Sequence, residues 1–188
     1  MMNCEIPLFA HDGYLLRPAR HADADAYYEH NFCPLDPKVA RLTGCRPNFT
    51  REEVVPFFHA CIGDEDRLDL LLIAPDGAIV GESVVNEIDW DARCANFRCA
   101  IFHPEHRGHG LGAFLIDSAC AAAFDHLHLH RLELDVFSFN SRALRAYERA
   151  GFVREGTRRA AIPDGEGWAD DILMAMLDTE WRARSKIC

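Results

Sequence analysis

Residues 104–113 of this 188-residue chain read Pro104-Glu105-His106-Arg107-Gly108-His109-Gly110-Leu111-Gly112-Ala113. It lies between an expected strand and an expected helix. Its three glycines allow tight turning, so that successive backbone N–H groups can face one concavity. The helix behind them begins with unpaired N–H donors and the positive end of its dipole. With the fixed charge of Arg107 beside it, this loop predicts a diphosphate-binding site.

Two other diphosphate folds fit the loop poorly. A dinucleotide fold requires Gly-x-Gly-x-x-Gly, usually in the first βαβ unit, with an acid about 20 residues later. Here the glycines are spaced Gly-x-Gly-x-Gly and lie past the middle of the chain. Asp135 is a candidate ribose partner, but too little chain follows it to complete a doubly wound sheet. The loop also lacks the Gly-Lys-Ser/Thr ending of a phosphate loop. A nucleotide-dependent oxidoreductase is therefore a weak alternative.

The elements around the loop alternate in type. Upstream, we expect strands at residues 15–18, 68–74, 78–88 and 95–102, with helices at 22–30 and after Thr50. Downstream, we expect helices at 111–124 and 141–150 and strands at 131–137, from 152, and at 172–177. This order predicts one α/β domain over residues 1–188. Its mixed central sheet combines antiparallel N-terminal strands with a β-α-β-α-β C-terminal half, and helices cover both faces.

The composition is that of a soluble globular protein, with 49% hydrophobic and 27% charged residues. No apolar run approaches the ~20 residues that cross a bilayer, and the N-terminus lacks the pattern of a secretory signal. We therefore expect a cytoplasmic protein with no membrane partner. The eight cysteines are scattered without a Cys-x-x-Cys pair, which indicates reduced thiols.

The formal net charge of −10 argues against nucleic acid as a partner, because phosphate backbones favour dense positive charge. An acidic surface favours a cationic substrate such as an amine. His126, His128 and His130 alternate as metal ligands can, but they follow a helix, where histidine commonly complements the dipole. No metal is expected.

Two signatures of one family stand in order along the chain. The first, Arg/Gln-x-x-Gly-x-Gly/Ala, reads here Arg107-Gly108-His109-Gly110-Leu111-Gly112. The second follows at the expected separation as Asn140, Tyr147 and Gly151-Phe152. The sequence therefore resembles the GCN5-related N-acetyltransferases (the GNAT superfamily). Between residues 137 and 152 it is very similar to the Rim-type branch, which acetylates ribosomal-protein N-termini.

This resemblance implies the GNAT fold and direct transfer of an acetyl group from acetyl-CoA to a primary amine in a ternary complex. It assigns cofactor binding to Ile101, Phe102, Arg107, Gly108, His109, Gly110, Leu111, Gly112, Ala113 and Asn140. Backbone N–H groups around Ile101 and Phe102 would stabilise the thioester oxygen. Tyr147 would protonate the departing thiolate, whose free pKa is about 8.5.

The spacing of Asn140 and Tyr147 is also consistent with a shared site. They are seven residues apart, about two helical turns, and therefore lie on one helix face. Asn140 opens the helix, where its amide can cap N–H groups or bind a ligand amide. The alternative for Tyr147 is a half-buried core tyrosine.

The general base is the least defined part of the prediction. Glu82, Glu87 and Asp89 lie on or just after the strand that precedes residue 95, and we rank Glu87 first. Taken singly, each of these acids fits a solvated strand residue better than a general base. Asn96 stands where many members of the family carry Glu, which weakens the case for a base on its own strand.

The acceptor amine is left open. A protein N-terminus, a polyamine, an aminoglycoside and a small amine all fit, because the acceptor contacts are expected from residues 14–61, where the resemblance is loose. A homodimer is also left open. The alternative function is a non-catalytic, regulatory CoA-binding domain of the same fold.

Overall fold

The computed structural model describes residues 6–184 and contains one eight-stranded sheet in the order β1-β2-β3-β4-β5-β6-β8-β7. The strands are β1 (Phe9–His11), β2 (Tyr14–Pro18), β3 (Leu68–Ile73), β4 (Ile79–Asp89), β5 (Cys94–Ile101), β6 (Arg131–Phe137), β7 (Val153–Asp164) and β8 (Gly167–Leu177). The helices are α1 (Ala24–Asn31), α2 (Pro37–Thr43), α3 (Arg51–Ile62), α4 (Leu111–Ala121), α5 (Ser141–Ala150) and α6 (Asp178–Arg184). The predicted mixed α/β architecture is confirmed.

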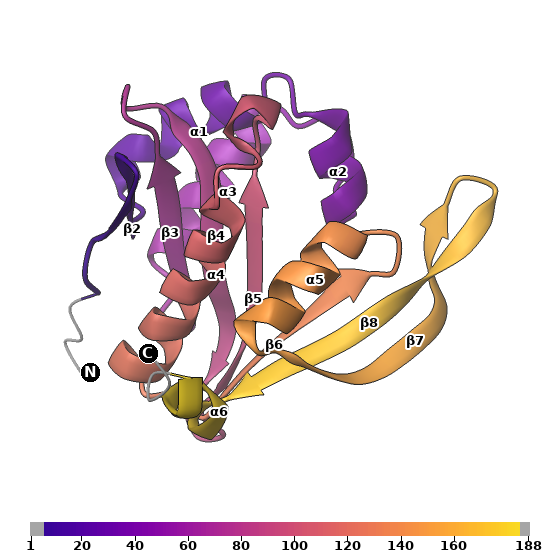
Figure 1. Cartoon of the computed structure of the whole chain (residues 1–188). Helices are drawn as coiled ribbons and strands as arrows, with labels where there is room; N and C mark the ends of the chain where they lie inside the picture. Colours follow the sequence, from indigo (N-terminus) through magenta and orange to yellow (C-terminus); the bar gives the residue numbers. More distant parts are fainter. Residues whose placement is uncertain (1–5, 185–188) are drawn as a thin grey trace.

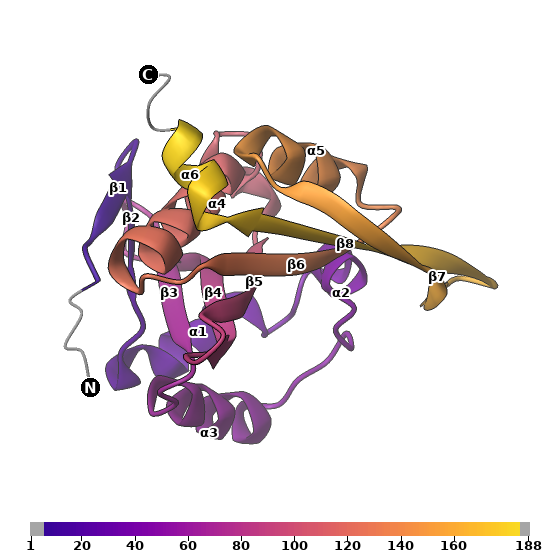
Figure 2. The same ribbon diagram turned by 90° about the horizontal axis from the view of Figure 1, so that it is seen from below.

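Helices cover both faces of the sheet, as predicted. α4 and α5 lie over one face, and α1 and α3 lie over the other (Figures 1 and 2). Phe97 and Leu132 are buried in the core on the α4 and α5 side. Tyr27 and Phe58 belong to the core beneath α1 and α3. Helices therefore cover both faces of the sheet, whereas β7 at its edge is largely exposed.

Local sequence explains how the helices beside the site begin and end. Gly110 is the N-cap residue before α4, and its φ of 77° is left-handed and suits glycine. Asn140 caps α5 by accepting a hydrogen bond from the N–H of Ala143 at 3.2 Å. Gly151 ends α5 with a φ of 96°, as predicted for the position after a helix.

One parallel pair, β5 with β6, opens the sheet. The two strands are in register only at Cys94↔Arg131, Ala95↔Leu132 and Asn96↔Glu133. Beyond these pairs, β5 continues to Ile101 and β6 to Phe137 without pairing to each other. β6 instead pairs along its whole length with β8. The two strands therefore separate toward their C-terminal ends, which leaves backbone groups of β5 without a strand partner.

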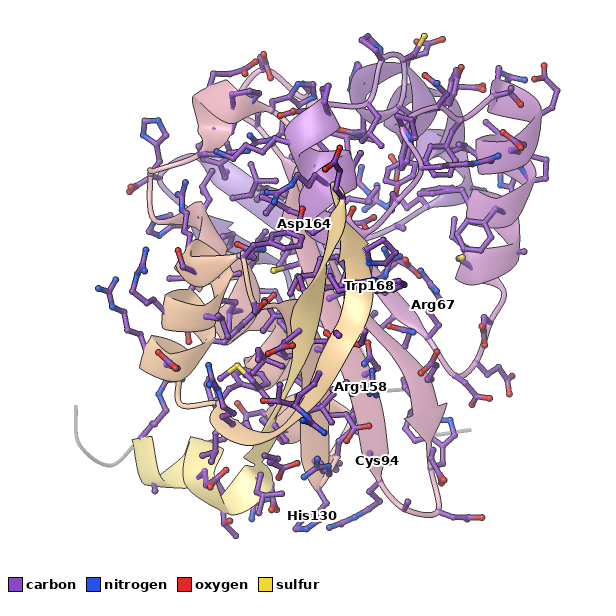
Figure 3. All side chains as sticks on the ribbon, turned by 90° about the vertical axis from the view of Figure 1, so that its right-hand side faces the viewer. Arg67, Cys94, His130, Arg158, Asp164 and Trp168 are labelled. Atoms are coloured by element: carbon purple, nitrogen blue, oxygen red, sulfur yellow. The ribbon has the colours of Figure 1, made fainter. Side chains whose placement is uncertain are left out.

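The end of the chain forms a long hairpin. β7 and β8 are antiparallel, and β8 lies between β6 and β7, so that β5 and β6 are the only parallel neighbours among the described strands. A tight turn at Gly165, whose φ is 63°, requires this antiparallel return. The hairpin projects beyond α5, and its tip lies beside α2, where Arg41 donates to Asp164 at 2.8 Å (Figures 1 and 3). β8 begins at Gly167, five residues before the predicted start at residue 172, whereas β7 begins one residue after its predicted start and no end was predicted for it.

Within residues 6–184, no helix has the length and apolar character needed to span a membrane.

The six cysteines that the structure describes are free thiols, whereas Cys4 and Cys188 lie outside the described residues.

Candidate active site

A cavity of about 570 Å³ occupies the gap between β5 and β6. Its walls come from both strands, from the first turns of α4 and α5, and from α2. Five of the predicted site residues line it together: Ile101, Arg107, Gly112, Asn140 and Tyr147. The topology thus brings together residues that are up to 46 positions apart, Ile101 and Tyr147 being the extremes.

Ile101 and Phe102 are not equivalent at the end of β5. The N–H of Phe102 donates to the carbonyl of Val80 at 2.9 Å and is therefore unable to serve a ligand. Because bonded and non-bonded pairs alternate in an antiparallel ladder, the N–H of Ile101 faces away from β4, toward the gap. The side chain of Phe102 is buried beneath α1. Of the two predicted donors, the structure leaves only Ile101.

The glycine loop presents open backbone to solvent. Gly108 has a left-handed φ of 97°, and a Cβ atom built at Gly108 or Gly112 meets no other atom within 4 Å. A ligand can therefore approach the main chain closely at both positions. His109 and Ala113 are exposed beside them, whereas the Leu111 side chain is buried against the core. Leu111 can contribute only its main chain to a ligand.

Arg107 does not present a free charge to the loop. Its guanidinium contacts the carboxylate of Asp36 at 2.5 Å and also donates to the carbonyls of Ile101 and Phe102, at 3.2 and 2.9 Å. Asp36 caps α2 by accepting from the N–H of Lys38 at 2.7 Å. Although burial opposes the change, these bonds lower the pKa of Asp36. Arg107 therefore fixes the loop and α2 to the end of β5, and its predicted role as the phosphate cation does not fit this geometry.

Arginines on α5 are the cations nearest the loop that have no acidic partner. Arg142, Arg145 and Arg149 line a second cavity of about 560 Å³ together with Gly108 and Gly112. These arginines were not among the predicted site residues. Their spacing of three and four residues on a predicted helix was the available signal.

Tyr147 lies on α5 and lines the cavity, with only 7% of its surface exposed. Its ring packs edge to face against Phe97 and Phe152, with centroid distances of 6.2 and 5.8 Å. Its hydroxyl lies 3.8 Å from the Sγ atom of Cys99. Burial, reinforced by Cys99, raises the pKa of Tyr147 well above its ordinary value. The phenol therefore carries its proton at neutral pH, as a general acid must.

Cys99 was not singled out in the sequence, because a lone cysteine on a strand carries no pattern. Burial raises the pKa of its thiol to about 11, although the hydrogen bond with Tyr147 opposes that shift. The thiolate is the nucleophilic form of cysteine, so this protonated thiol is unsuited to carry an acetyl group at neutral pH. Its position favours direct transfer.

Asn140 combines the two roles that its position allows. Its Oδ1 atom accepts from the N–H of Ala143, which is the capping role. Its amide nitrogen has no hydrogen-bond partner among residues 6–184, and the residue lines the cavity. That nitrogen is available to a ligand carbonyl.

The three candidate bases occupy different places. Glu82 lines the cavity, is 5% exposed, and accepts from the Tyr27 hydroxyl at 2.6 Å and from Arg98 at 2.9 Å. Glu87 is exposed in a bulge of β4 with a φ of 54° and does not line the cavity. Asp89 accepts from the N–H of Ala92 in the turn after β4. Five residues of strand, about 16 Å, separate Glu87 from Glu82, so the ranking of Glu87 as first candidate is not supported.

The last of the three histidines after α4, His130, has an acidic partner. His130 contacts the Asp178 carboxylate at 2.9 Å. Across residues 6–184, no group of three His, Cys, Asp or Glu side chains is arranged to hold a metal ion.

Comparison with known proteins decides the family. A model of the acetyltransferase (GNAT) domain matches residues 14–153. The chain belongs to this family. The predicted GNAT fold is confirmed, and so is the predicted enzyme class, N-acetyltransferase. Acetyl-CoA is the co-substrate of this family.

Individual relatives share a narrower description. A spermidine N(1)-acetyltransferase of Vibrio cholerae serotype O1 is 38% identical over 78 residues, or 42% of this chain and 44% of that protein. The match thus spans less than half of that relative. The fold is similar to spermidine N-acetyltransferase from Vibrio cholerae in complex with CoA and spermine, with a TM-score of 0.81 and 24% identity over 92% of this chain and 99% of that one.

A second solved structure gives a comparable match. A dodecameric structure of the Vibrio cholerae spermidine N-acetyltransferase superposes with a TM-score of 0.77 and 24% identity, over 93% of this chain and 99% of that one. None of these three relatives is described as a member of the Rim-type branch, so that finer resemblance gains no support from them.

Proposed function

We propose that this N-acetyltransferase acts on a primary amine of a polyamine, by direct transfer from acetyl-CoA in a ternary complex. The observation that carries the proposal is the gap between β5 and β6. It brings the Tyr147 hydroxyl, the edge of β5 at Ile101 and the carboxylate of Glu82 to one cavity.

The residues at the mouth of this gap fit the donor. Gly108 and Gly112 leave room for a diphosphate against the main chain, and α4 adds the positive end of its dipole. The free N–H of Ile101 and the amide nitrogen of Asn140 offer donors along the path from the loop to Tyr147. These contacts orient the thioester between the two strands.

Three groups then divide the chemistry. The amine nitrogen bonds to the thioester carbon, and its proton passes to Glu82, directly or through water. The N–H of Ile101 donates to the carbonyl oxygen as negative charge develops there. The C–S bond breaks, and the leaving sulfur takes the proton of the Tyr147 hydroxyl, which solvent restores.

Acidic side chains beside the gap favour a polycationic acceptor. Glu82 and Asp135 line the cavity, and Arg158 bridges Asp135 and Asp171 at 3.2 and 2.9 Å. Asp171 is buried outside the cavity lining, so Glu82 and Asp135 are the two carboxylates that an ammonium group of the acceptor could approach. The spermidine N-acetyltransferases among the relatives agree with this class.

Release of CoA thiol with an amine panel tests the proposal. The panel contains spermidine, spermine, an aminoglycoside, a small monoamine and a peptide with a free N-terminus. We expect the highest kcat/KM with spermidine or spermine. A preference for the peptide would instead support the Rim-type assignment, and binding of CoA without turnover of any amine would support the non-catalytic alternative.

Localisation in the cytoplasm and self-association remain predictions. The dodecamer described for the Vibrio cholerae enzyme makes a higher oligomer a reasonable extension of the homodimer left open by the sequence. Analytical ultracentrifugation measures this directly.

A further inference from the structure

Three arginines form an unpaired cationic face on α5. Arg142, Arg145 and Arg149 are exposed, and their spacing of three and four residues places them on one side of the helix. No carboxylate among residues 6–184 bonds to any of them. We call these three residues the α5 arginine face.

This arrangement is unfavourable without a ligand. Like charges three or four residues apart destabilise a helix, and no carboxylate among residues 6–184 forms an ion pair with these arginines, although Glu148 lies three residues from Arg145. Other arginines differ in this respect: Arg17 pairs with Asp23 and Arg67 pairs with Asp69, whereas the exposed Arg159 has no bonded acid among residues 6–184. The α5 arginine face differs from Arg159 in that three such arginines share one side of a helix. The chain as a whole has a net charge of −10, so a local cluster of cations without acidic partners favours the binding of an anion at that place.

The arginine face lies on the path that leads out of the active-site cavity. The second cavity, of about 560 Å³, is lined by the glycine loop on one side and by the arginine face on the other. Gly112, Arg142 and Ala146 belong to the walls of both cavities. A ligand that extends from Tyr147 past the loop therefore emerges between the loop and α5.

The two charged residues that line this second cavity outside α5, Arg184 and Asp117, form an ion pair. Arg184 lies within 3.3 Å of the Asp117 carboxylate and also donates to the Ala150 carbonyl. The charges of Arg184 and Asp117 therefore offset each other. The free positive charge in the cavity comes from α5.

We infer that the α5 arginine face binds the 3′-phosphate on the ribose of CoA and thereby selects CoA over its dephosphorylated form. This inference rests on the proposed function, which places the diphosphate at the loop. CoA carries a phosphomonoester beyond its diphosphate. Such a group bears a charge of about −1.5 to −2 at neutral pH and accepts charge-assisted hydrogen bonds from guanidinium groups. Arg145 and Arg149 lie about one and two turns after the start of α5 and supply these hydrogen bonds.

Calorimetric titration with CoA and with 3′-dephospho-CoA tests the inference. The wild type should bind CoA about 10- to 100-fold more tightly, as expected for one or two charge-assisted hydrogen bonds at an exposed site. In an Arg145→Gln/Arg149→Gln double variant, the ratio of the two Kd values should fall below about 3-fold, while the Kd for 3′-dephospho-CoA stays unchanged. Added salt should weaken CoA binding less steeply in the double variant than in the wild type.

Arg159→Gln is the matched control, because this exposed arginine of β7 also lacks a bonded acid among the described residues and lies outside both cavities. It should leave the ratio unchanged. Equal affinity of the wild type for the two ligands overturns the inference, as does a double variant that weakens both ligands equally. If neither CoA nor 3′-dephospho-CoA binds, the result also contradicts the proposal that acetyl-CoA is the acetyl donor. If CoA release proceeds but the ratio is near one, only this inference fails.

Discussion

The hydroxyl of Tyr147 and the thiol of Cys99 meet at 3.8 Å across the gap between α5 and β5. Each group is buried, and burial raises the pKa of both. Two protonated donors therefore face each other in the cavity that the thioester would enter. Of the two, the tyrosine is the suitable acid, because it is the residue that the motif spacing and the cavity walls both indicate.

Cys99 should be inert at neutral pH. Its pKa of about 11 in the folded protein lies above the ordinary thiol value, so the reactive thiolate is depleted below pH 9 and appears only as the pH rises toward 11. Iodoacetamide at pH 8 should modify the exposed Cys33 and Cys45 and spare Cys99, as read by peptide mass spectrometry. Alkylation of Cys99 at the rate of Cys45, or an acetyl adduct on Cys99 during turnover, would contradict direct transfer.

The same pKa shift links stability to pH. A raised folded pKa means that the thiol contributes its full stabilisation below its unfolded pKa and loses it as the pH rises through the folded value. Between pH 9 and about 11, the free energy of unfolding should therefore fall more steeply in the wild type than in Cys99→Ala. Urea denaturation at several pH values measures the difference, and parallel curves would refute it.

Gly112→Leu should separate folding from donor binding. The position is helical, a Cβ atom there meets no protein atom within 4 Å, and Leu is a better helix former than Gly, so the variant should be about as stable as the wild type. The long side chain extends into the space proposed for the diphosphate, so we expect the Kd for acetyl-CoA to rise about 10-fold or more, measured by calorimetry. Gly112→Ala is the matched control, because the family signature allows Ala at this position, and it should keep the wild-type affinity.

Gly110 is a less clean position for this experiment. Its φ of 77° strains any other residue, and its Cβ would come within 3.3 Å of His11. Loss of binding in Gly110→Val would therefore mix strain with steric exclusion. Unchanged acetyl-CoA affinity in a folded Gly112→Leu protein would exclude the loop from the donor site.

Glu82→Gln and Glu87→Gln form a matched pair that locates the base. Glu82 lines the cavity and Glu87 does not, so the first change should lower kcat by about 10²-fold and the second should leave it within about 2-fold. The amide keeps the shape of Glu82 and can still accept from the Tyr27 hydroxyl. Steady-state kinetics with the best amine gives both values. The opposite ranking would restore Glu87, and two unaffected variants would leave water alone as the proton acceptor.

Periodicity and turn chemistry were sufficient for most of the fold. The strand over residues 131–137 and the helix over 141–150 were predicted with their observed ends, because alternating apolar residues and a glycine stop are local signals. The insertion of β8 between β6 and β7 was not predicted, since strand order depends on long-range pairing. α2 was missed because its seven residues are too few to show a helical period.

The candidate site likewise contains residues that local sequence motifs predict and residues whose roles depend on tertiary contacts. Tyr147, Asn140 and the glycine loop follow from motif spacing, which is local. The pairing of Arg107 with Asp36, 71 residues away, depends on tertiary contact, so no pattern in the sequence reveals that its charge is already neutralised. The choice of Glu82 over Glu87 likewise depends on where the strands separate.

Tyr147→Phe is the decisive test of the mechanism. If the phenol protonates the leaving sulfur, it acts mainly as the C–S bond breaks, so its loss should lower kcat and leave the Kd for acetyl-CoA nearly unchanged. General-acid contributions are typically about 10²–10⁴-fold, and water entering the cavity would bring the loss toward the lower end. The phenylalanine ring preserves the contacts with Phe97 and Phe152, and the hydroxyl has only the weak 3.8 Å contact with Cys99, so stability should change little. A core-packing role predicts the reverse pattern, with lowered stability and normal turnover. Single-turnover rates on the folded variant distinguish the two, and a wild-type rate would show that Tyr147 is not the acid.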